Sequence, residues 1–238
     1  MSTNAALCEW LHQSLDALSL FSYLDVAALP SNGIYFFYEK GECCGHQAAM
    51  PRIVRVGTHR DGNFQRRIAE HFLLDERKMA FTQDQPAPHD RSIFRKHIGA
   101  LLKKAGDPYL SVWENDFTTR KARDTKRHLR DISKEVTIER EVTQILRERF
   151  SFRSIEIADQ MQRMGSQGLE RALIGTLASR PLCGPSDGWL GCYSPKVQIR
   201  EKGLWLIQHL TAAPLSSAQR DLITAAVEKG VKVDAAGG

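Results

Sequence analysis

The chain has 238 residues, of which 42% are hydrophobic and 26% are charged, as is typical of a globular protein. Its 33 Lys and Arg outnumber its 28 Asp and Glu, and the formal net charge of +5 weakly favours a polyanionic partner. No segment approaches the roughly 18 consecutive apolar residues of a membrane span. The composition also excludes collagen-like, coiled-coil and wholly disordered chains.

The N-terminus and the cysteines indicate the compartment. The first 21 residues contain neither a basic leader nor a continuous apolar run, so we expect no secretory signal. The cysteines are odd in number and scattered, at positions 8, 43, 44, 183 and 192. We therefore expect reduced thiols in a cytoplasmic protein.

Hydrophobic periodicity predicts the first elements of the chain. Leucines recur at helical spacing within residues 4–19, which predicts a helix. A turn cluster then leads into the aromatic segment 34–38, which favours a strand. A long hairpin loop over residues 39–50 is followed by a second strand over residues 53–56.

The rest of the chain alternates between helical and extended patterns. We expect a helix over Phe64 to Phe72 with Asn63 as its cap, and an exposed polar excursion over residues 75–90. The elements expected after it are a helix over 92–104, a short strand over 109–113, a helix over 136–150, a strand over 152–157, a helix over 169–177, a mixed segment over 189–210 and a helix over 216–229.

One segment concentrates the positive charge. Residues 118–130 contain six Lys and Arg and one Asp, a net of 6 − 1 = +5. Such blocks are commonly interaction arms, although a solvated helix face is the plain alternative. Phosphate contacts from an arm of this kind give salt-sensitive affinity for nucleic acid. The candidate DNA-contacting residues are Arg120, Lys121, Arg123, Lys126 and Arg127 in this segment, and Arg95 and Lys96 near the start of an earlier helix.

Three features that carry chemistry follow one another along the chain. The first is a strand with a tyrosine two residues after a glycine, Gly33-Ile34-Tyr35. The second is a strand ending as Arg55-Val56-Gly57, which leads to a helix that carries Arg67 and His71. The third is Glu170, which begins a helix with an apolar face.

These residue types suit phosphodiester hydrolysis. A guanidinium such as that of Arg67 can bind two phosphate oxygens and neutralise developing charge. A single carboxylate with bound waters suits Mg²⁺, and such a metal stabilises a leaving oxygen and activates water. The phenol of Tyr35 can serve as a base only where nearby cations, such as Arg55, lower its pKa.

In these residues the sequence resembles the GIY-YIG nuclease family. The first family motif corresponds to NGIYFF, Asn32 to Phe37, and the second to VRVGT, Val54 to Thr58, followed by the helix with Arg67 and His71. Further segments resemble one bacterial branch of the family, namely DRSIFRKHIGALL (90–102), LERALIGTL (169–177), WLGCYSP (189–195) and IREKGLW (199–205).

The resemblance implies an α/β fold, a small three-stranded antiparallel sheet flanked by helices, and metal-dependent cleavage of DNA. It implies that Tyr35 is a general base or positions the nucleophile and that Gly57 allows a close approach of the backbone. It also implies that Arg67 binds phosphate, that His71 is auxiliary and that Glu170 holds the metal, Mg²⁺ or Mn²⁺.

The sequence also departs from the family pattern. Arg55 stands where the second motif usually has tyrosine, and residues 179–188 contain no asparagine after the glutamate helix. Glu139 is an alternative metal ligand because it also lies on a helix with an apolar face. The departures motivate an alternative interpretation, a catalytically degenerate DNA-binding module. A third interpretation is a protein that does not bind nucleic acid and whose positive surface is incidental.

The expected organisation has three parts. An N-terminal helical segment covers residues 1–30, a nuclease domain covers 31–210 with its basic insertion around 118–130, and a C-terminal helix and tail cover 211–238. DNA is the expected partner and no membrane contact is expected. The sequence leaves the oligomeric state open.

Overall fold

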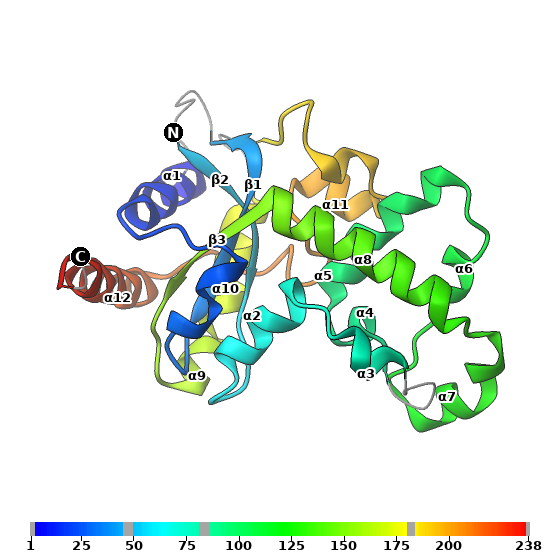
Figure 1. Ribbon diagram of the computed structural model, residues 1–238. Coiled ribbons are helices and arrows are strands. Elements are labelled where there is room, and N and C mark those ends of the chain that lie inside the picture. Colours follow the sequence, from blue (N-terminus) through cyan, green and yellow to red (C-terminus); the bar gives the residue numbers. More distant parts are fainter. Residues whose placement is uncertain (1–2, 45–49, 81–85, 180–183, 237–238) are drawn as a thin grey trace.

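The protein is built around a three-stranded antiparallel sheet (Figure 1). The computed structural model describes residues 3–44, 50–80, 86–179 and 184–236. Strands β1 (Ile34–Cys43), β2 (Pro51–Gly57) and β3 (Phe150–Ile155) lie in the order β2-β1-β3. The expected α/β fold with a small antiparallel sheet is therefore confirmed.

One face of the sheet packs on the terminal helices. Side chains alternate along a strand, so Ile34 and Phe36 of β1 point to this face. It is covered by α1 (Thr3–Asp16), α10 (Leu169–Ala178) and α12 (Ser217–Ala236), as Figure 1 shows. The first and last helices thus belong to the same hydrophobic core as the sheet.

The opposite face packs on the middle helices. Tyr35 and Phe37 point to this side, where they meet α2 (Phe64–Phe72), α5 (Ile93–Gly99) and α8 (Ile132–Arg149) (Figure 1). Trp189 and Trp205 are fully buried in the same cluster and anchor the core on this side of the sheet. The remaining elements are η1 (Tyr23–Ala28), α3 (Glu76–Ala80), α4 (Pro88–Arg91), η2 (Ala100–Ala105), α6 (Leu110–Trp113), α7 (Arg120–Lys126), η3 (Arg127–Leu129), α9 (Gln160–Arg163), η4 (Leu190–Tyr193) and α11 (Val197–Lys202).

Two expected elements differ in the structure. The expected strand over residues 109–113 is the short helix α6, which begins after Pro108 and places Tyr109 and Trp113 together in the core. Their spacing of four residues puts both aromatic rings on one face of a helix. The same spacing also puts them on one face of a strand, so the sequence pattern does not distinguish the two structures. The polar excursion over residues 75–90 contains the helices α3 and α4 and buries Met79 and His89.

Three further expectations change in detail. β1 extends to Cys43, into the segment expected as a hairpin loop, whose residues 45–49 lie outside the described residues. The helix expected over 92–104 ends at Gly99, where an added Cβ would stand 2.2 Å from the Trp113 ring, and continues as the 3-10 helix η2. Cys44 is disulfide-bonded, which corrects the expectation that every thiol is reduced.

A buried ion pair ties α5 to α8. The Arg95 guanidinium donates to one carboxylate oxygen of Glu139 from Nε at 2.9 Å and from Nη2 at 2.5 Å, and both side chains are fully buried. Its other hydrogen bonds go to the backbone oxygens of His71 and Glu139 and to the Thr143 hydroxyl. Arg95 therefore cannot reach DNA, which corrects its assignment as a phosphate contact.

The interactions of Glu139 also bear on its prediction as an alternative metal ligand. Its second carboxylate oxygen accepts from the His89 ring at 2.7 Å and from the His89 backbone N–H at 3.2 Å. Arg95 holds the pKa of this carboxyl below its ordinary value against the opposing effect of burial. Both oxygens are thus used inside the core, and Glu139 offers no free oxygen to a metal.

Among the described residues, no helix combines the length and the apolar character that crossing a bilayer requires.

The Arg95–Glu139 pair predicts a large effect of a small substitution. Glu139→Gln removes the charge that compensates a buried guanidinium, so we expect the free energy of unfolding to fall by about 3–5 kcal/mol. Urea denaturation measures this change. The control Glu141→Gln alters an exposed glutamate of the same helix and should change stability by less than about 0.5 kcal/mol. Equal midpoints of urea denaturation for Glu139→Gln and wild type would contradict a buried ion pair between Arg95 and Glu139.

Candidate active site

The candidate site forms where β1 begins and β2 ends. These ends meet because the strands are antiparallel, and Tyr35 pairs directly with Gly57 across the ladder. The Tyr35 ring lies over Gly57, where an added Cβ would stand 2.1 Å from the phenol oxygen. Any other residue at position 57 would displace the ring, so the glycine provides the space for the phenol.

The Tyr35 hydroxyl is surrounded by nitrogen groups from three side chains. It lies 3.0 Å from the His71 Nε2 atom on α2. It also interacts by charge and hydrogen bonding with the guanidinium groups of Arg55 on β2 and Arg67 on α2. The structure therefore brings together four of the residues that the sequence selected, from segments up to 36 residues apart.

His71 connects the phenol to the start of α5. Its Nδ1 atom lies 2.7 Å from the Ser92 hydroxyl, which also accepts the Arg95 N–H at 3.2 Å. Ser92 is fully buried, and in the described part of the chain only His71 is placed to accept its proton. The Ser92 hydroxyl therefore donates to Nδ1, and the His71 Nε2–H donates to the Tyr35 oxygen.

His71 is held in its neutral form. Burial lowers its pKa well below the ordinary value, and the charges of Arg67, Arg55 and Arg95 lower it further. A neutral ring with its proton on Nε2 presents a fixed donor to Tyr35.

Arg55 is buried beneath the phenol rather than exposed on the strand. Its guanidinium donates to the Trp205 carbonyl at 2.5 Å and stacks over the Phe94 ring at 5.0 Å. Burial lowers its pKa, and the phenol of Tyr35 partly offsets this shift. A second-motif tyrosine would offer a hydroxyl here, whereas this chain offers a cation.

Arg67 is the more accessible of the two guanidinium groups. One of its terminal nitrogens donates to Glu70 at 3.2 Å and to the backbone carbonyl of Arg91 at 2.7 Å. Burial acts to lower its pKa, but the interactions with Tyr35 and Glu70 outweigh it and raise the pKa overall. Its side chain remains 24% exposed, so its fork can meet a phosphate from solvent.

Glu170 reaches the same place from the other face of the sheet. It stands in the first turn of α10, and one carboxylate oxygen accepts the Thr58 N–H, just after β2, at 3.2 Å. Burial raises its pKa, and the Thr58 N–H and the charge of Arg55 partly offset this. Among the described residues its second oxygen has no hydrogen-bond partner, so it can take a ligand.

The site opens to solvent through a cavity of about 380 Å³. Arg67 and Thr58 belong to its wall, and the buried Tyr35 lies behind Arg67. The other wall residues are His59, Arg60, Asn63, Arg66, Glu70 and Met164. The cavity therefore gives a ligand access to the guanidinium and to the strand end that holds Glu170.

The donor set is compatible with one hard cation. Among the described residues no cluster of three or more His, Cys, Asp or Glu side chains could enclose a metal. The half-buried carboxylate of Glu170, with one oxygen held by Thr58 and the other available, suits a cation that keeps most of its waters. Mg²⁺ and Mn²⁺ bind in this way, so the residues present fit such an ion.

Some residues of the site carry no signal in the sequence. His59 accepts the Gly33 N–H through Nε2 at 3.1 Å and stacks on Phe64, which fixes the entry to β1. His209 lies near enough to Glu170 to influence its pKa and has a left-handed backbone (φ 59°). Neither histidine belongs to a recognisable spacing, and only the fold brings them to the site.

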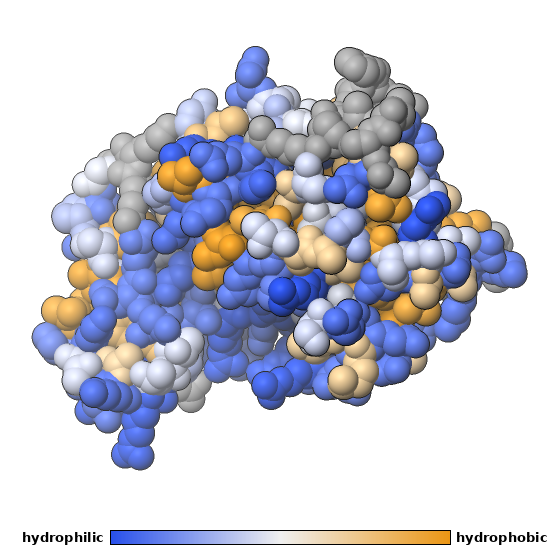
Figure 2. Space-filling view, turned by 180° about the vertical axis from the view of Figure 1, so that it is seen from behind, coloured by the Kyte–Doolittle hydropathy of each residue, from blue (hydrophilic) through white to orange (hydrophobic). Residues whose placement is uncertain are grey.

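The basic segment lies at an exposed corner. Arg120 and Lys121 are exposed on α7, whereas Arg123 donates to two backbone carbonyls and Lys126 to Asn115. Figure 2 shows this corner, at the lower left, as mostly hydrophilic. The other expected contact, Lys96, is only 21% exposed and lies 3.6 Å from Asp90.

Comparison with known proteins identifies a family. A family model described as a GIY-YIG domain matches residues 3–232, a range that includes α1 and most of α12. No curated protein and no solved structure matches the chain.

The close contact at Gly57 predicts the effect of adding one methyl group. Gly57→Ala forces the Tyr35 ring from its place, and we expect the free energy of unfolding to fall by about 1–3 kcal/mol. Chemical denaturation measures the decrease. Gly184→Ala, where an added Cβ meets no atom within 4 Å, should change stability by less than about 0.5 kcal/mol. Equal decreases of the free energy of unfolding in the two variants would contradict the close contact between position 57 and the Tyr35 ring.

His97 predicts a pH dependence of stability. Burial, aided by the charge of Arg55, lowers its pKa from 6.5 to about 3. Below pH 6.5 the unfolded chain therefore binds a proton that the folded protein does not, and the free energy of unfolding falls as the pH falls. Each such group contributes a slope of about 1.4 kcal/mol per pH unit.

Denaturation between pH 4 and 6 measures this slope. His97→Gln should make the dependence shallower by about 1.4 kcal/mol per pH unit. The control His128→Gln changes an exposed histidine and should leave the slope as it is. A His97→Gln slope equal to that of wild type would show that His97 is protonated in the folded protein.

Proposed function

Because the chain belongs to the GIY-YIG domain family, we propose that it is a divalent-metal-dependent DNA endonuclease. GIY-YIG domains are typical of nucleases that act on DNA. The observation that carries the proposal is the convergence of Tyr35, Arg67 and Glu170 around the end of β2, beside a cavity open to solvent.

The proposed roles follow from the position of each group. Arg67 binds two oxygens of the scissile phosphate through its exposed fork and neutralises charge that develops on them. Tyr35, whose oxygen accepts the His71 Nε2–H and interacts with Arg67, orients the attacking water once Arg67 has turned to the phosphate. Glu170 holds the cation, which when bound supplies stabilisation of the leaving oxygen.

Arg55 changes the electrostatics of this arrangement. Its guanidinium interacts with the phenol oxygen, as does that of Arg67, so two cations lie beside this oxygen. Their positive charge attracts the phosphate of the substrate to the site. This gives the departure from the second-motif tyrosine a role that is consistent with catalysis.

Plasmid nicking tests the proposal. In Mg²⁺ the wild type should convert supercoiled DNA to nicked circles, and EDTA should abolish the reaction. Arg67→Ala and Glu170→Gln should each reduce the rate about a hundredfold or more, because each removes stabilisation of charge at the reacting phosphate.

The controls are exposed residues of the same type. Arg171→Ala and Glu228→Gln lie on helix surfaces and should nick at the wild-type rate. Equal nicking by wild type, Arg67→Ala and Glu170→Gln would mean a contaminant or another site.

A second candidate function is a DNA-binding module without catalysis. The observation in its favour is the buried Arg55, which replaces a hydroxyl that could orient the water. Salt-sensitive DNA binding without cleavage in any divalent ion would select this function instead.

The exposed basic residues of α7 predict a change in salt dependence. If Arg120 and Lys121 neutralise DNA phosphates, the double variant Arg120→Ala/Lys121→Ala loses up to two phosphate contacts. The phosphates concerned then keep their counterions when the protein binds. The slope of log K against log salt should then become shallower by about 0.9 for each such phosphate. Fluorescence anisotropy with a duplex measures the slope. Arg171→Ala/Lys232→Ala removes the same charge elsewhere, and an equal change in both double variants would contradict a local role of α7.

A further inference from the structure

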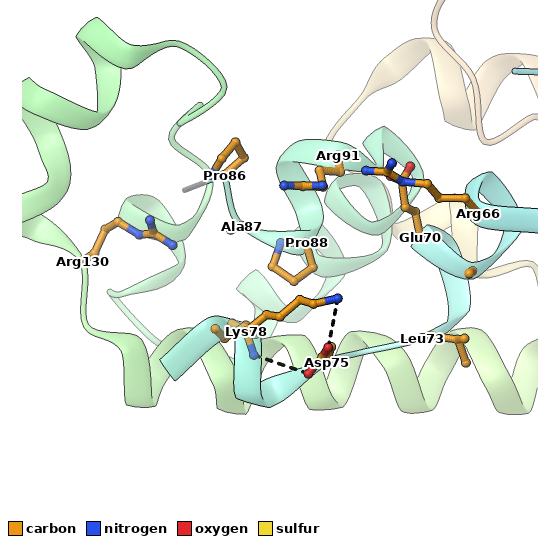
Figure 3. A pocket seen from close by; sticks show the side chains of 12 residues that line it. Arg66, Glu70, Leu73, Asp75, Lys78, Pro86, Ala87, Pro88, Arg91 and Arg130 are labelled. Carbon is orange, nitrogen blue, oxygen red and sulfur yellow. Dashed lines mark hydrogen bonds and ion pairs between the residues drawn. The ribbon is translucent and has the colours of Figure 1, made fainter. Parts of the chain in front are cut away.

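A second, larger cavity of about 670 Å³ adjoins the candidate site. Arg66 and Glu70 of α2 belong to the walls of both cavities. Figure 3 shows the second cavity between α2, the helices α3 and α4, and the segment of Arg130. Its volume lies within the range of sites that bind small molecules.

The lining combines an apolar surface with positive charge. The apolar part consists of Ala69, Leu73, Met79, Pro86, Ala87 and Pro88. The charged part has four cationic groups, Arg66, Lys78, Arg91 and Arg130, against the two carboxylates of Glu70 and Asp75. In Figure 3 Arg66 and Arg91 lie on one side of the cavity, with Lys78 and Asp75 across from them.

The cations differ in how firmly they are held. Arg130 is committed to a buried ion pair with Glu135 at 2.6 Å. Lys78 pairs with Asp75 at 3.2 Å and Arg66 with Glu70 at 3.5 Å, but these pairs are exposed and therefore weak.

Arg91 is the cation most available to a ligand. Its side chain is exposed and has no hydrogen bond or ion pair to any other described residue. It can turn toward an anion without breaking an existing interaction.

The cavity is joined to the site through the backbone. Arg67, the proposed phosphate-binding residue, donates to the Arg91 carbonyl at 2.7 Å. A strand whose phosphate rests on Arg67 therefore places its neighbouring nucleotide at the mouth of the second cavity.

We propose that this cavity binds an unpaired nucleotide of the DNA strand, next to the scissile phosphate. The base rests on the apolar surface formed by residues such as Leu73 and Pro88, and the adjoining phosphate meets Arg91 and Lys78. A base within a duplex is stacked and paired and cannot enter such a cavity without being extruded. The proposal rests on the proposed function and specifies its substrate, DNA with a single-stranded segment beside the cleavage point.

Binding measured without metal separates this proposal from cleavage. The probes are one labelled duplex with blunt ends and the same duplex with about six unpaired nucleotides at its 5′ or its 3′ end. Fluorescence anisotropy in EDTA gives the affinities. We expect the wild type to bind one of the overhang probes about tenfold more tightly than the blunt duplex, in line with the contribution of base contacts to single-strand binding.

Two variants locate the preference in the cavity. Arg91→Ala removes an exposed side chain but keeps the carbonyl that holds Arg67, and Lys78→Ala removes the cation across the cavity. Each should lower the overhang preference to about threefold or less and leave blunt-duplex affinity nearly unchanged. The control Lys232→Ala, on α12, should keep the full preference.

Three results would overturn the proposal. They are equal affinity of the wild type for all probes, an unchanged preference in both cavity variants, and competition by a free deoxynucleoside monophosphate as strong as that by an overhang strand. The first two remain informative if nicking is observed, because the protein is then a nuclease without this subsite. An overhang preference that depends on Arg91, together with no nicking, would instead contradict only the endonuclease.

Discussion

The site depends on the close approach of Tyr35 to Gly57 across two antiparallel strands. The missing side chain at position 57 lets the phenol lie flat against β2, with its oxygen directed toward α2. From this position it meets the Arg55 guanidinium from its own sheet, and Arg67 and His71 from the helix that follows. The absence of a side chain at position 57 therefore determines which charged groups can contact the Tyr35 oxygen.

The groups that position the site residues lie on both faces of the sheet. On one face, Ser92 and Arg95 of the α5 region fix His71, through its ring and through its backbone carbonyl. On the other face, α10 delivers Glu170 to the amide that follows β2. The carboxylate and the guanidinium groups thus approach the end of β2 from opposite sides, and neither layer alone contains a complete constellation.

Much of this arrangement could be predicted because its signals are local. The helix Phe64–Phe72 has the predicted bounds, since a turn precedes it and its apolar residues follow a helical period. The prediction for residues 109–113 is wrong because two aromatic rings four positions apart satisfy a helix as well as a strand. External roles were predicted for Arg95 and Glu139, and nothing local distinguishes a surface charge from one whose partner lies 44 residues away. No local pattern identifies His59 and His209 either, because only the tertiary structure brings them to the site.

The hydrogen bond from Arg67 to residue 91 uses a main-chain oxygen and not a side chain. Every amino acid supplies that oxygen, so the anchoring of the guanidinium does not depend on which residue occupies position 91. The side chain there lines the neighbouring cavity and can change in size and charge without loss of this hydrogen bond. Two different parts of one residue, its backbone and its side chain, thus determine the placement of the guanidinium and the character of the cavity wall.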